Sequence, residues 1–291
     1  MISEAQHKKV VAEHFTGKSR EWREIYDQNT EERTSFYTEL HIKRKDNVLR
    51  LLTDFANGRA LNVLDIGCGP GILMKEVLQL GHEATGLDIA ETMIREAEET
   101  LRDYMPRRTR CIVGDVENLL FQDGTFEAVL CIGVLQFLPS TFKSISEITR
   151  VLKEGGVTII SLPNILKMNY FFDPYYYLVR GIAFLHHKLM PGSNNAVVAT
   201  NINTNEGFIN KHYYYGSARK IFPPSKIPVR EVKCIGFGPF TFWKKEILPI
   251  DISKRISSLL ESASAQGAGK ILRFFSDQWV MSFTKQSGNA E

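Results

Sequence analysis

The sequence has no long apolar run and no clustered cysteines, and these absences narrow the class of protein. Nowhere do 18 apolar residues follow one another, so no membrane span is predicted. The four cysteines lie far apart, with neither zinc-type nor redox-type spacing. The opening stretch MISEAQHKKVVAEHF has no continuous apolar segment, so no secretory signal is predicted. A reducing, cytoplasmic location is the expectation from these features.

The sequence also has little net charge and no internal repeat. Its 36 basic and 33 acidic side chains leave a formal charge of +3 over 291 residues. Nucleic-acid-binding domains usually show a clear basic excess, so a nucleic-acid partner is not expected. Histidines and carboxylates show no recognisable metal-ligand spacing, so no metal site is predicted. The apolar share of 43% is ordinary for a globular protein.

Strand-like and helix-like segments alternate through the middle of the chain. Short apolar runs predict strands at 61–66, 83–89, 110–113, 126–132 and 157–162. Helical spacing predicts helices at 72–80, 92–101 and 142–152, and the Glu-Gly-Gly of 154–156 predicts a turn. Strands separated by helices indicate a mostly parallel, doubly wound sheet. Such sheets bind ligands beyond the carboxyl ends of their strands.

The sequence predicts four parts of the chain, with this core as the second. We expect an N-terminal helical cap over 1–57, an α/β core over 58–162, a helical insertion or lid over 163–215, and the rest of the core over 216–291. An unstructured loop of about fifty residues is improbable in a compact domain, which is why the insertion is expected to fold. After it we predict a helix at 217–222, a strand at 229–235, a partly helical stretch at 244–275 and a last strand at 279–283.

A glycine-rich loop follows the first predicted strand, in LNVLDIGCGPGILMKEVLQLG. Its glycines are spaced G-x-G-x-G from Gly67, and Ile72 stands where a dinucleotide-binding loop has its third glycine. Asp65 lies two residues ahead of the first glycine. A carboxylate there is unfavourable beside a pyrophosphate but suits an ammonium group. The loop is therefore better matched to an amino-acid moiety than to a phosphate.

Two more acidic residues follow the next two predicted strands. Asp88, in GLDIA, lies 21 residues after Gly67, where a carboxylate can accept both hydroxyls of a ribose. Asp115, in CIVGDVENL, can accept from an adenine amino group while the backbone at Val116 faces a ring nitrogen. A cap at the strand end is the alternative for each aspartate alone. A fourth feature is the next predicted strand, FEAVLCIGVLQFL, followed by ITRVLKEGGVTIISLPN. The order and spacing of the four features together favour a ligand with amino-acid, ribose and adenine parts.

In these motifs the sequence resembles the class I S-adenosylmethionine-dependent methyltransferases. The matching stretches are VLDIGCGPG, GLDIAETMI, GDVENLLF, FEAVLCIGVLQFLP and LKEGGVTII, within about residues 60–165. The resemblance implies a Rossmann-like sheet of seven strands with an antiparallel last strand. It also implies S-adenosyl-L-methionine as cofactor, with S-adenosyl-L-homocysteine as product. The cofactor-binding residues that it implies are Tyr26, Arg44, Asp65, Gly67, Cys68, Gly69, Asp88, Ile89, Met93, Asp115, Val116, Cys131 and Gly133.

The resemblance does not identify a general base. Relatives that act on quinone precursors often carry Glu-His shortly after the fourth strand, where this chain has Gln136-Phe137. The candidates in and after the insertion are His212, Glu206 and His186. Catalysis by proximity and desolvation, without a base, stays open.

Aromatic residues crowd the predicted insertion, between Tyr170 and Phe184 and again at 213–215. They form either the core of a helical cap or an apolar pocket for a hydrophobic, ring-bearing substrate. Contact with a membrane surface, or with a second copy of the chain in a homodimer, is a third hypothesis.

We therefore expect a methyltransferase that acts on a small, lipophilic or aromatic acceptor. O- or N-methylation is favoured, and C-methylation stays open. Two rivals from other classes remain. One is a non-catalytic cofactor-binding protein that holds a partner with its insertion, and the other is a nicotinamide oxidoreductase.

Overall fold

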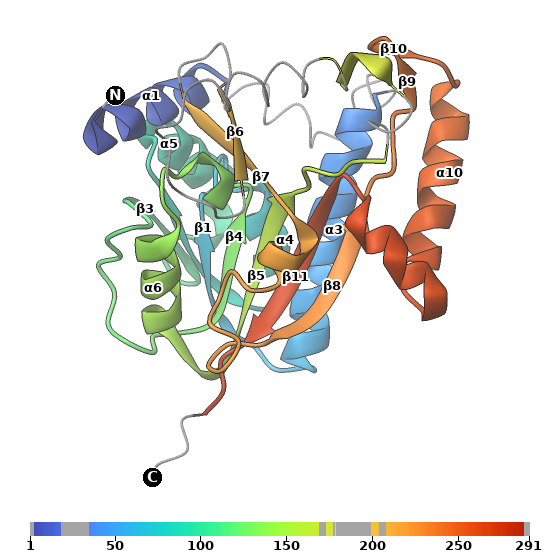
Figure 1. Ribbon diagram of the computed structural model, residues 1–291. Helices are drawn as coiled ribbons and strands as arrows, with labels where there is room; N and C mark the ends of the chain where they lie inside the picture. The colour runs from blue at the N-terminus through green and yellow to red at the C-terminus, as the bar shows by residue number, and fades with distance from the viewer. Residues whose placement is uncertain are drawn as a thin grey trace.

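The computed structural model describes residues 3–18, 35–168, 173–176, 178, 199–203 and 208–287. Its centre is a seven-stranded sheet with the order β3-β2-β1-β4-β5-β11-β8 (Figure 1). The strands are β1 (Asn62–Ile66), β2 (Glu83–Asp88), β3 (Thr109–Val113), β4 (Phe126–Ile132), β5 (Leu152–Pro163), β8 (Val229–Ile235) and β11 (Gln278–Thr284). The first five pair in parallel, and β11 is antiparallel to both β5 and β8. The predicted sheet with its antiparallel last strand is confirmed.

Both faces of the sheet are buried, because successive strand residues point to opposite sides. Val129 and Cys131 of β4 belong to one apolar cluster, and Ala128 and Leu130 belong to the other. The helices that follow the strands are α4 (Ile72–Gln79), α5 (Glu91–Thr100), α6 (Phe142–Val151) and α10 (Ile250–Ala263). They cover the two faces, which makes the sheet the middle layer (Figure 1).

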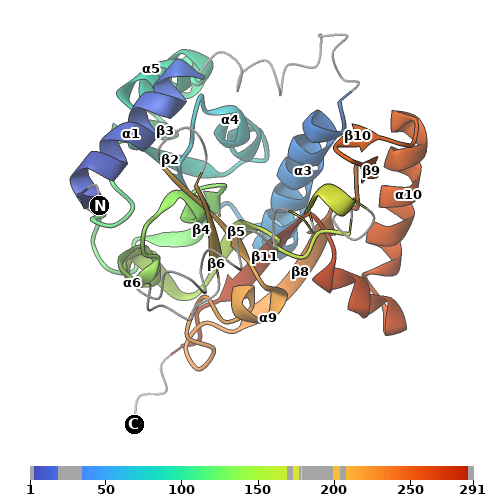
Figure 2. The ribbon, with the colours of Figure 1, turned by 45° about the horizontal axis from the view of Figure 1, so that its top comes forward.

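In the described part of the chain before the sheet lie the helices α1 (Glu4–Gly17) and α3 (Phe36–Ala56). Each begins at a serine whose hydroxyl accepts a backbone N–H of the first turn: Ser3 from Gln6 at 3.2 Å and Ser35 from Thr38 at 3.1 Å. The buried side of α3 packs on the sheet through Val48 and its neighbours. Helix α1 lies instead beside α5, at the edge where the parallel strands end (Figure 2).

The predicted turn at 154–156 is wrong, because these residues lie inside β5. Gly155 has φ +72°, its N–H donates to the carbonyl of Lys285, and the N–H of Lys285 donates to Gly156. Between the pairs Phe126↔Leu152 and Ala128↔Val157 the register shifts, so the stretch forms a bulge in the strand. The sequence pattern identifies the glycines but not their pairing with Lys285, the residue that follows β11.

The helix predicted at 217–222 is shorter and earlier, as α9 spans Tyr215–Ala218. The partly helical stretch at 244–275 is confirmed by α10 and by the 3₁₀ segment Gly267–Phe274. A short hairpin of β9 (Thr241–Phe242) and β10 (Lys245–Glu246) precedes α10.

The insertion holds a two-stranded antiparallel ribbon of β6 (Ala199–Asn203) and β7 (Ile209–Tyr213). The sequence predicts a helical insertion and misses this ribbon, whose asparagines are poor strand formers. A tertiary contact holds β7: Tyr213 accepts from the N–H of Ile165 at 3.0 Å and donates its hydroxyl to the carbonyl of Leu135 at 3.2 Å. The division of the chain at 57, 162 and 215 stays a prediction. Among the described helices, none has the length and apolar character needed to cross a membrane.

Candidate functional site

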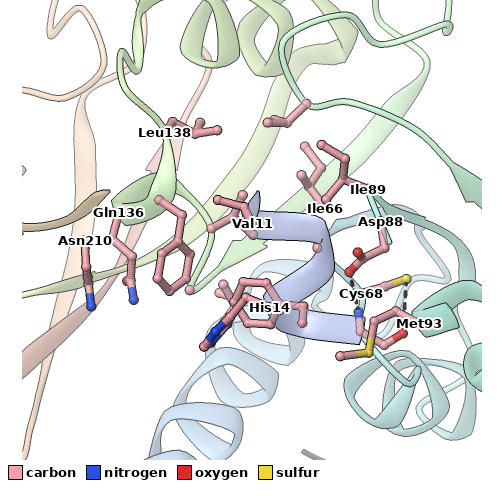
Figure 3. A pocket seen from close by; sticks show the side chains of 18 of the residues that line it. Val11, His14, Ile66, Cys68, Asp88, Ile89, Met93, Gln136, Leu138 and Asn210 are labelled. Carbon is pink, nitrogen blue, oxygen red and sulfur yellow. Dashed lines mark hydrogen bonds between the residues drawn. The ribbon is translucent and has the colours of Figure 1, made fainter. Parts of the chain in front are cut away.

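A cavity of about 600 Å³ lies at the carboxyl ends of the parallel strands, between α1, α3 and β7. This is the edge where ligands of doubly wound sheets bind. Twelve of the predicted site residues line it: Arg44, Asp65, Gly67, Cys68, Gly69, Asp88, Ile89, Met93, Asp115, Val116, Gly133 and His212. In Figure 3, Cys68, Asp88 and Met93 lie on one side, Gln136 and Asn210 on the other, and Val11 and His14 of α1 between them.

The glycine loop between β1 and α4 is fastened to β2. The N–H groups of Gly67 and Cys68 both donate to the carbonyl of Leu87, at 2.7 and 3.1 Å. Gly67 has φ +71°, and a Cβ added there would lie 2.3 Å from Val134 Cγ2. Gly69 also has a positive φ, of 52°, but a Cβ there would meet nothing within 4 Å. The first glycine is thus required for packing as well as for backbone conformation.

Asp88 joins the glycine loop to the start of α5. Its Oδ2 accepts from the N–H of Gly69 at 3.0 Å, and its Oδ1 accepts from the N–H of Ala90 at 2.9 Å. Burial raises the pKa of this carboxyl, and the backbone donors partly oppose that rise. The strand-end cap named above as an alternative is therefore present. Each oxygen keeps further acceptor capacity toward the cavity.

Asp65 is the most deeply buried acid of the site. Burial raises its pKa to about 8, and the nearby charge of Asp88 adds to the rise. Within the described parts of the chain, the structure gives this carboxyl no hydrogen-bond donor and no cation, although it lines the cavity. Buried carboxylates are normally paired. With a pKa of about 8 the group is mostly protonated at pH 7, and a positive charge beside it would favour its ionised form.

A lysine of helix α1 forms an ion pair with Asp115, the third acidic residue of the predicted site. Lys8 Nζ lies 2.7 Å from Asp115 Oδ2 and also pairs with Glu117 and Glu4. Burial lowers the pKa of Lys8, but hydrogen bonds to these three carboxylates outweigh it and raise the pKa above its usual range. Asp115 Oδ1 accepts from the N–H of Glu117 at 2.9 Å. Sequence reasoning identifies Asp115 but misses Lys8, because the pair joins residues over a hundred positions apart.

Arg44 of α3 lies over the turn that follows β4. A Cβ added at Gly133 would be 3.5 Å from Arg44 Nη1, so the guanidinium closely covers that glycine. Arg44 Nη2 donates to His41 Nδ1 at 2.7 Å. Burial and the charge of Arg44 hold the pKa of His41 well below its usual range, so this histidine is neutral. Cys131, predicted beside Gly133, is completely buried and is absent from the cavity lining.

The other side of the cavity is aromatic. The ring of Phe208 lies 4.7 Å from that of His14 and 5.7 Å from that of Phe137, and Phe15 lies 5.3 Å from Phe137. These rings come from α1, from the turn after β4 and from the residue before β7. All four line the cavity and pack on one another as an aromatic wall. We call the aromatic wall, together with the polar residues Lys167 and Asp277 that also line the cavity, the acceptor side.

A scan of known families finds a match over residues 64–160 to a model described as "Methyltransferase domain". The middle of the chain, residues 64–160, is therefore a methyltransferase domain. The matched segment includes the glycine loop, Asp88, Asp115 and the end of β4, which are the parts that build one side of the cavity.

Similar proteins extend this result in part. A sterol 4-C-methyltransferase of Caenorhabditis elegans is 33% identical over 101 residues, 34% of this chain and 30% of the relative. A ubiquinone biosynthesis O-methyltransferase of Chromobacterium violaceum is 33% identical over 124 residues, 40% of this chain and 52% of the relative. The chain thus matches at most about half the length of either relative.

A solved structure shares the fold over nearly the whole chain. It is 1,6-didemethyltoxoflavin-N1-methyltransferase of Burkholderia thailandensis, solved with 1,6-didemethyltoxoflavin and S-adenosylhomocysteine. The TM-score is 0.60 at 13% identity, covering 99% of this chain and 92% of that one. At this identity the likeness shows the fold alone.

The structure also bears on the predicted residues outside the methyltransferase domain match. His212 of β7 lines the cavity, whereas Tyr26, His186 and Glu206 lie outside the described residues. Sequence reasoning missed Asp277 and Lys167, which line the acceptor side. A signal was available for Asp277, because it lies two residues before the predicted last strand, 279–283, which the resemblance implies to be antiparallel. The start of that strand must lie where the parallel strands end. In the described parts of the chain, no group of three His, Cys, Asp or Glu residues is placed to hold a metal ion.

Proposed function

We propose that the chain transfers the methyl group of S-adenosyl-L-methionine to a small, lipophilic or aromatic acceptor, with S-adenosyl-L-homocysteine as the second product. O- or N-methylation is favoured, and C-methylation stays open. The observation that carries the proposal is Asp65, a buried acid that lines the cavity beside the glycine loop and has no protein cation among the described residues. An amino-acid ammonium is the ligand group that suits it.

The remaining residues of this side fit the other parts of the same cofactor. Asp88 has acceptor capacity for the ribose hydroxyls, and Asp115 with the backbone of Val116 suits the adenine edge. Arg44, held over Gly133 by neutral His41, is placed for the cofactor carboxylate. Lys8 of α1 neutralises Asp115 and Glu117 and so fastens α1 over this part of the cavity.

Methyl transfer requires mainly that the protein position the acceptor against the methyl group. The bound sulfonium supplies an activated methyl group, which an in-line nucleophile displaces. The protein must hold that nucleophile about 3 Å from the methyl carbon, in line with the sulfur, and exclude water. Helix α1 covers the cavity and provides the exclusion, while the wall of Phe137, Phe208 and His14 holds the acceptor. Aromatic faces also stabilise a sulfonium by cation–π attraction.

Support for a small, ring-bearing acceptor comes from the wall and from the relatives' names. The sterol and ubiquinone-pathway relatives act in the chemistry of small lipophilic molecules, and the solved neighbour holds a heteroaromatic ligand. The contact of the insertion with a membrane surface or with a second copy stays a prediction.

Calorimetry with S-adenosylhomocysteine tests the proposal. We expect micromolar binding by the wild type and loss of binding in Asp88→Asn, which removes a charge at the ribose site. Asp54→Asn is the matched control, since Asp54 is an exposed residue of α3. Absence of binding by the folded wild type would contradict the proposal, and tight NADH binding instead would support the oxidoreductase.

A further inference from the structure

Asp277 is a buried carboxylate that the cofactor-binding motifs leave without a role. It is the residue before β11, is only 3% exposed and lines the cavity. Strand β11 runs antiparallel to β5 and lies two strands away from β4 in the sheet. Its first residues therefore reach the cavity from the side opposite the glycine loop. Asp277 thus belongs to the acceptor side.

The contacts of Asp277 differ from those of a carboxylate used only for structure. Asp173, which is absent from the cavity lining, accepts from Thr241 Oγ1, and from the N–H groups of Trp243, Lys244 and Tyr175, at 2.7 to 3.0 Å. Asp277 Oδ2 accepts from the N–H of Gly238 at 3.4 Å, and its Oδ1 lies 4.0 Å from Lys167 Nζ. The Asp277 carboxylate is held in place but is not saturated with donors.

The backbone around Asp277 fixes its direction. Its own N–H donates to the carbonyl of Gly236 at 2.7 Å, and its carbonyl accepts from the N–H of Asn164 at 2.9 Å. A Cβ added at Gly236 would lie 2.6 Å from Asp277 Oδ2 and 2.3 Å from Leu40 of α3. The side chain is therefore confined between the β8–β9 loop, α3 and Lys167, with the cavity in front of it.

The charges around Asp277 keep it able to exchange a proton near neutral pH. Burial raises its pKa to about 6, Lys167 opposes that rise and Glu261 of α10 adds to it. Helix α3 contributes Arg44 and neutral His41 to the same cavity. At pH 7 Asp277 is mostly ionised, which is the state in which it accepts a proton.

We infer that Asp277 is the general base of the acceptor side, and that the acceptor carries a hydroxyl on an aromatic ring. The inference rests on the proposed function and names its substrate class. As the acceptor oxygen bonds to the methyl carbon, the carbon–sulfur bond breaks and its electron pair stays on sulfur, giving the neutral thioether. The hydroxyl proton passes to Asp277 and leaves to solvent in the next turnover. Lys167 stabilises the developing phenolate, and the aromatic wall holds the ring.

The test measures S-adenosylhomocysteine release with a fixed panel of phenols of graded acidity: 4-nitrophenol, catechol, 3,4-dihydroxybenzoate and 4-alkylphenols. Asp277→Asn keeps the acceptor for Gly238 but cannot take a proton. We expect kcat to fall about 100-fold for the weakly acidic phenols, with KM within about 3-fold. 4-Nitrophenol is the most acidic phenol of the panel and is already partly ionised near neutral pH, so its kcat should fall much less. In the wild type kcat should fall toward acid pH as Asp277 becomes protonated, and in Asp277→Asn this acid limb of the pH profile should be absent. His212→Gln, at the other base candidate, should keep that limb.

Binding of S-adenosylhomocysteine separates this inference from the proposed function. If the wild type does not bind it, the proposed function fails and the inference with it. If the wild type binds it but methylates no phenol of the panel, the inference is overturned while cofactor binding stands. Equal loss of turnover for all phenols in Asp277→Asn, or loss of the acid limb in His212→Gln alone, would also overturn it. Calorimetry on Asp277→Asn, expected to match the wild type, shows that the variant is folded.

Discussion

The two sides of the cavity are built in different ways. On the cofactor side, Asp65, Asp88 and Asp115 each lie at or just after the end of a strand, and Gly67 and Gly69 are bonded to the neighbouring strand end. On the acceptor side, Phe137, Phe208 and Asp277 come from segments about 70 residues apart. Short motifs therefore supply the acids and glycines of one side, to which Lys8 and Arg44 are added from distant helices, whereas long-range packing builds the whole of the other. Substitutions on the cofactor side should alter stability and cofactor affinity through local geometry. Substitutions on the acceptor side should leave the affinity for the cofactor unchanged.

Gly67→Ala should have the largest effect, because it breaks the local geometry outright. The added methyl would meet Val134 Cγ2 at 2.3 Å at a backbone φ of +71°. We expect unfolding in urea to show a loss of about 3 kcal/mol, from conformational strain and overpacking together. Gly69→Ala, with a similar φ and open space, should lose only about 1 kcal/mol. Val134→Ala should recover part of the loss in the double variant, and equal losses at both glycines would contradict the packing argument.

Asp65→Asn should separate stability from binding. The pKa of Asp65 is about 8 in the folded chain against an ordinary 3.8, so folding favours the protonated acid. Stability of the wild type therefore falls as the pH rises from about 4 to 8, and the variant escapes that fall. We expect a gain on the order of 2 kcal/mol at pH 8 and none at pH 3, measured by thermal unfolding.

The same variant should bind S-adenosylhomocysteine about 10- to 100-fold more weakly, because the ammonium loses its charged partner. In the wild type, affinity should rise as the pH approaches 8, and binding at pH 7 should release close to one proton. Calorimetry in buffers of different ionisation enthalpy measures that proton. A wild-type affinity independent of pH between 6 and 8 would argue against Asp65 as the partner.

Phe208→Ala should show that the acceptor side acts separately. Phe208 is buried and packs on His14 and Phe137. Removing the ring should raise KM for an aromatic acceptor about 10-fold and leave S-adenosylhomocysteine affinity unchanged. Phe142→Ala is the control, because Phe142 of α6 is 81% exposed. Steady-state kinetics measures KM for the acceptor, and calorimetry measures the affinity for S-adenosylhomocysteine. If both weaken equally, the acceptor side does not act separately from the cofactor side.

Lys8→Ala should have the smallest effect of these substitutions, and it tests whether α1 contributes to cofactor binding. Lys8 ties α1 to Asp115 and Glu117, so its loss should loosen the cover of the adenine subsite. We expect S-adenosylhomocysteine to bind about 3-fold more weakly, since partly exposed ion pairs contribute little. Lys9→Ala, at the neighbouring and largely exposed position, should bind like the wild type. A gain in affinity in Lys8→Ala would mean that Lys8 competes with the cofactor for Asp115.

The accuracy of sequence reasoning depends on whether a local pattern or a distant contact determines the segment. Strands β1, β4 and β8 were predicted to within a residue, because apolar runs bounded by turns carry a strong local signal. The ribbon of β6 and β7 was missed, because its contacts with Ile165 and Leu135 stabilise it rather than its own strand propensity. The bulge at 154–156 was taken for a turn, because only its pairing with Lys285 shows that it continues the strand.

By itself the sequence determined the alternation of strands and helices in the core and the acids at the strand ends, while the antiparallel last strand followed only from the resemblance to the methyltransferases. The alternation and the acids depend on periodicity and on residues within a few positions of one another. Only the tertiary structure decided that α1 is tied over Asp115 through Lys8, that Arg44 covers Gly133, and that Asp277 faces the cavity. Those placements come from contacts between residues far apart in the chain. No local pattern records such contacts, because packing and burial bring the residues together only when the whole domain folds.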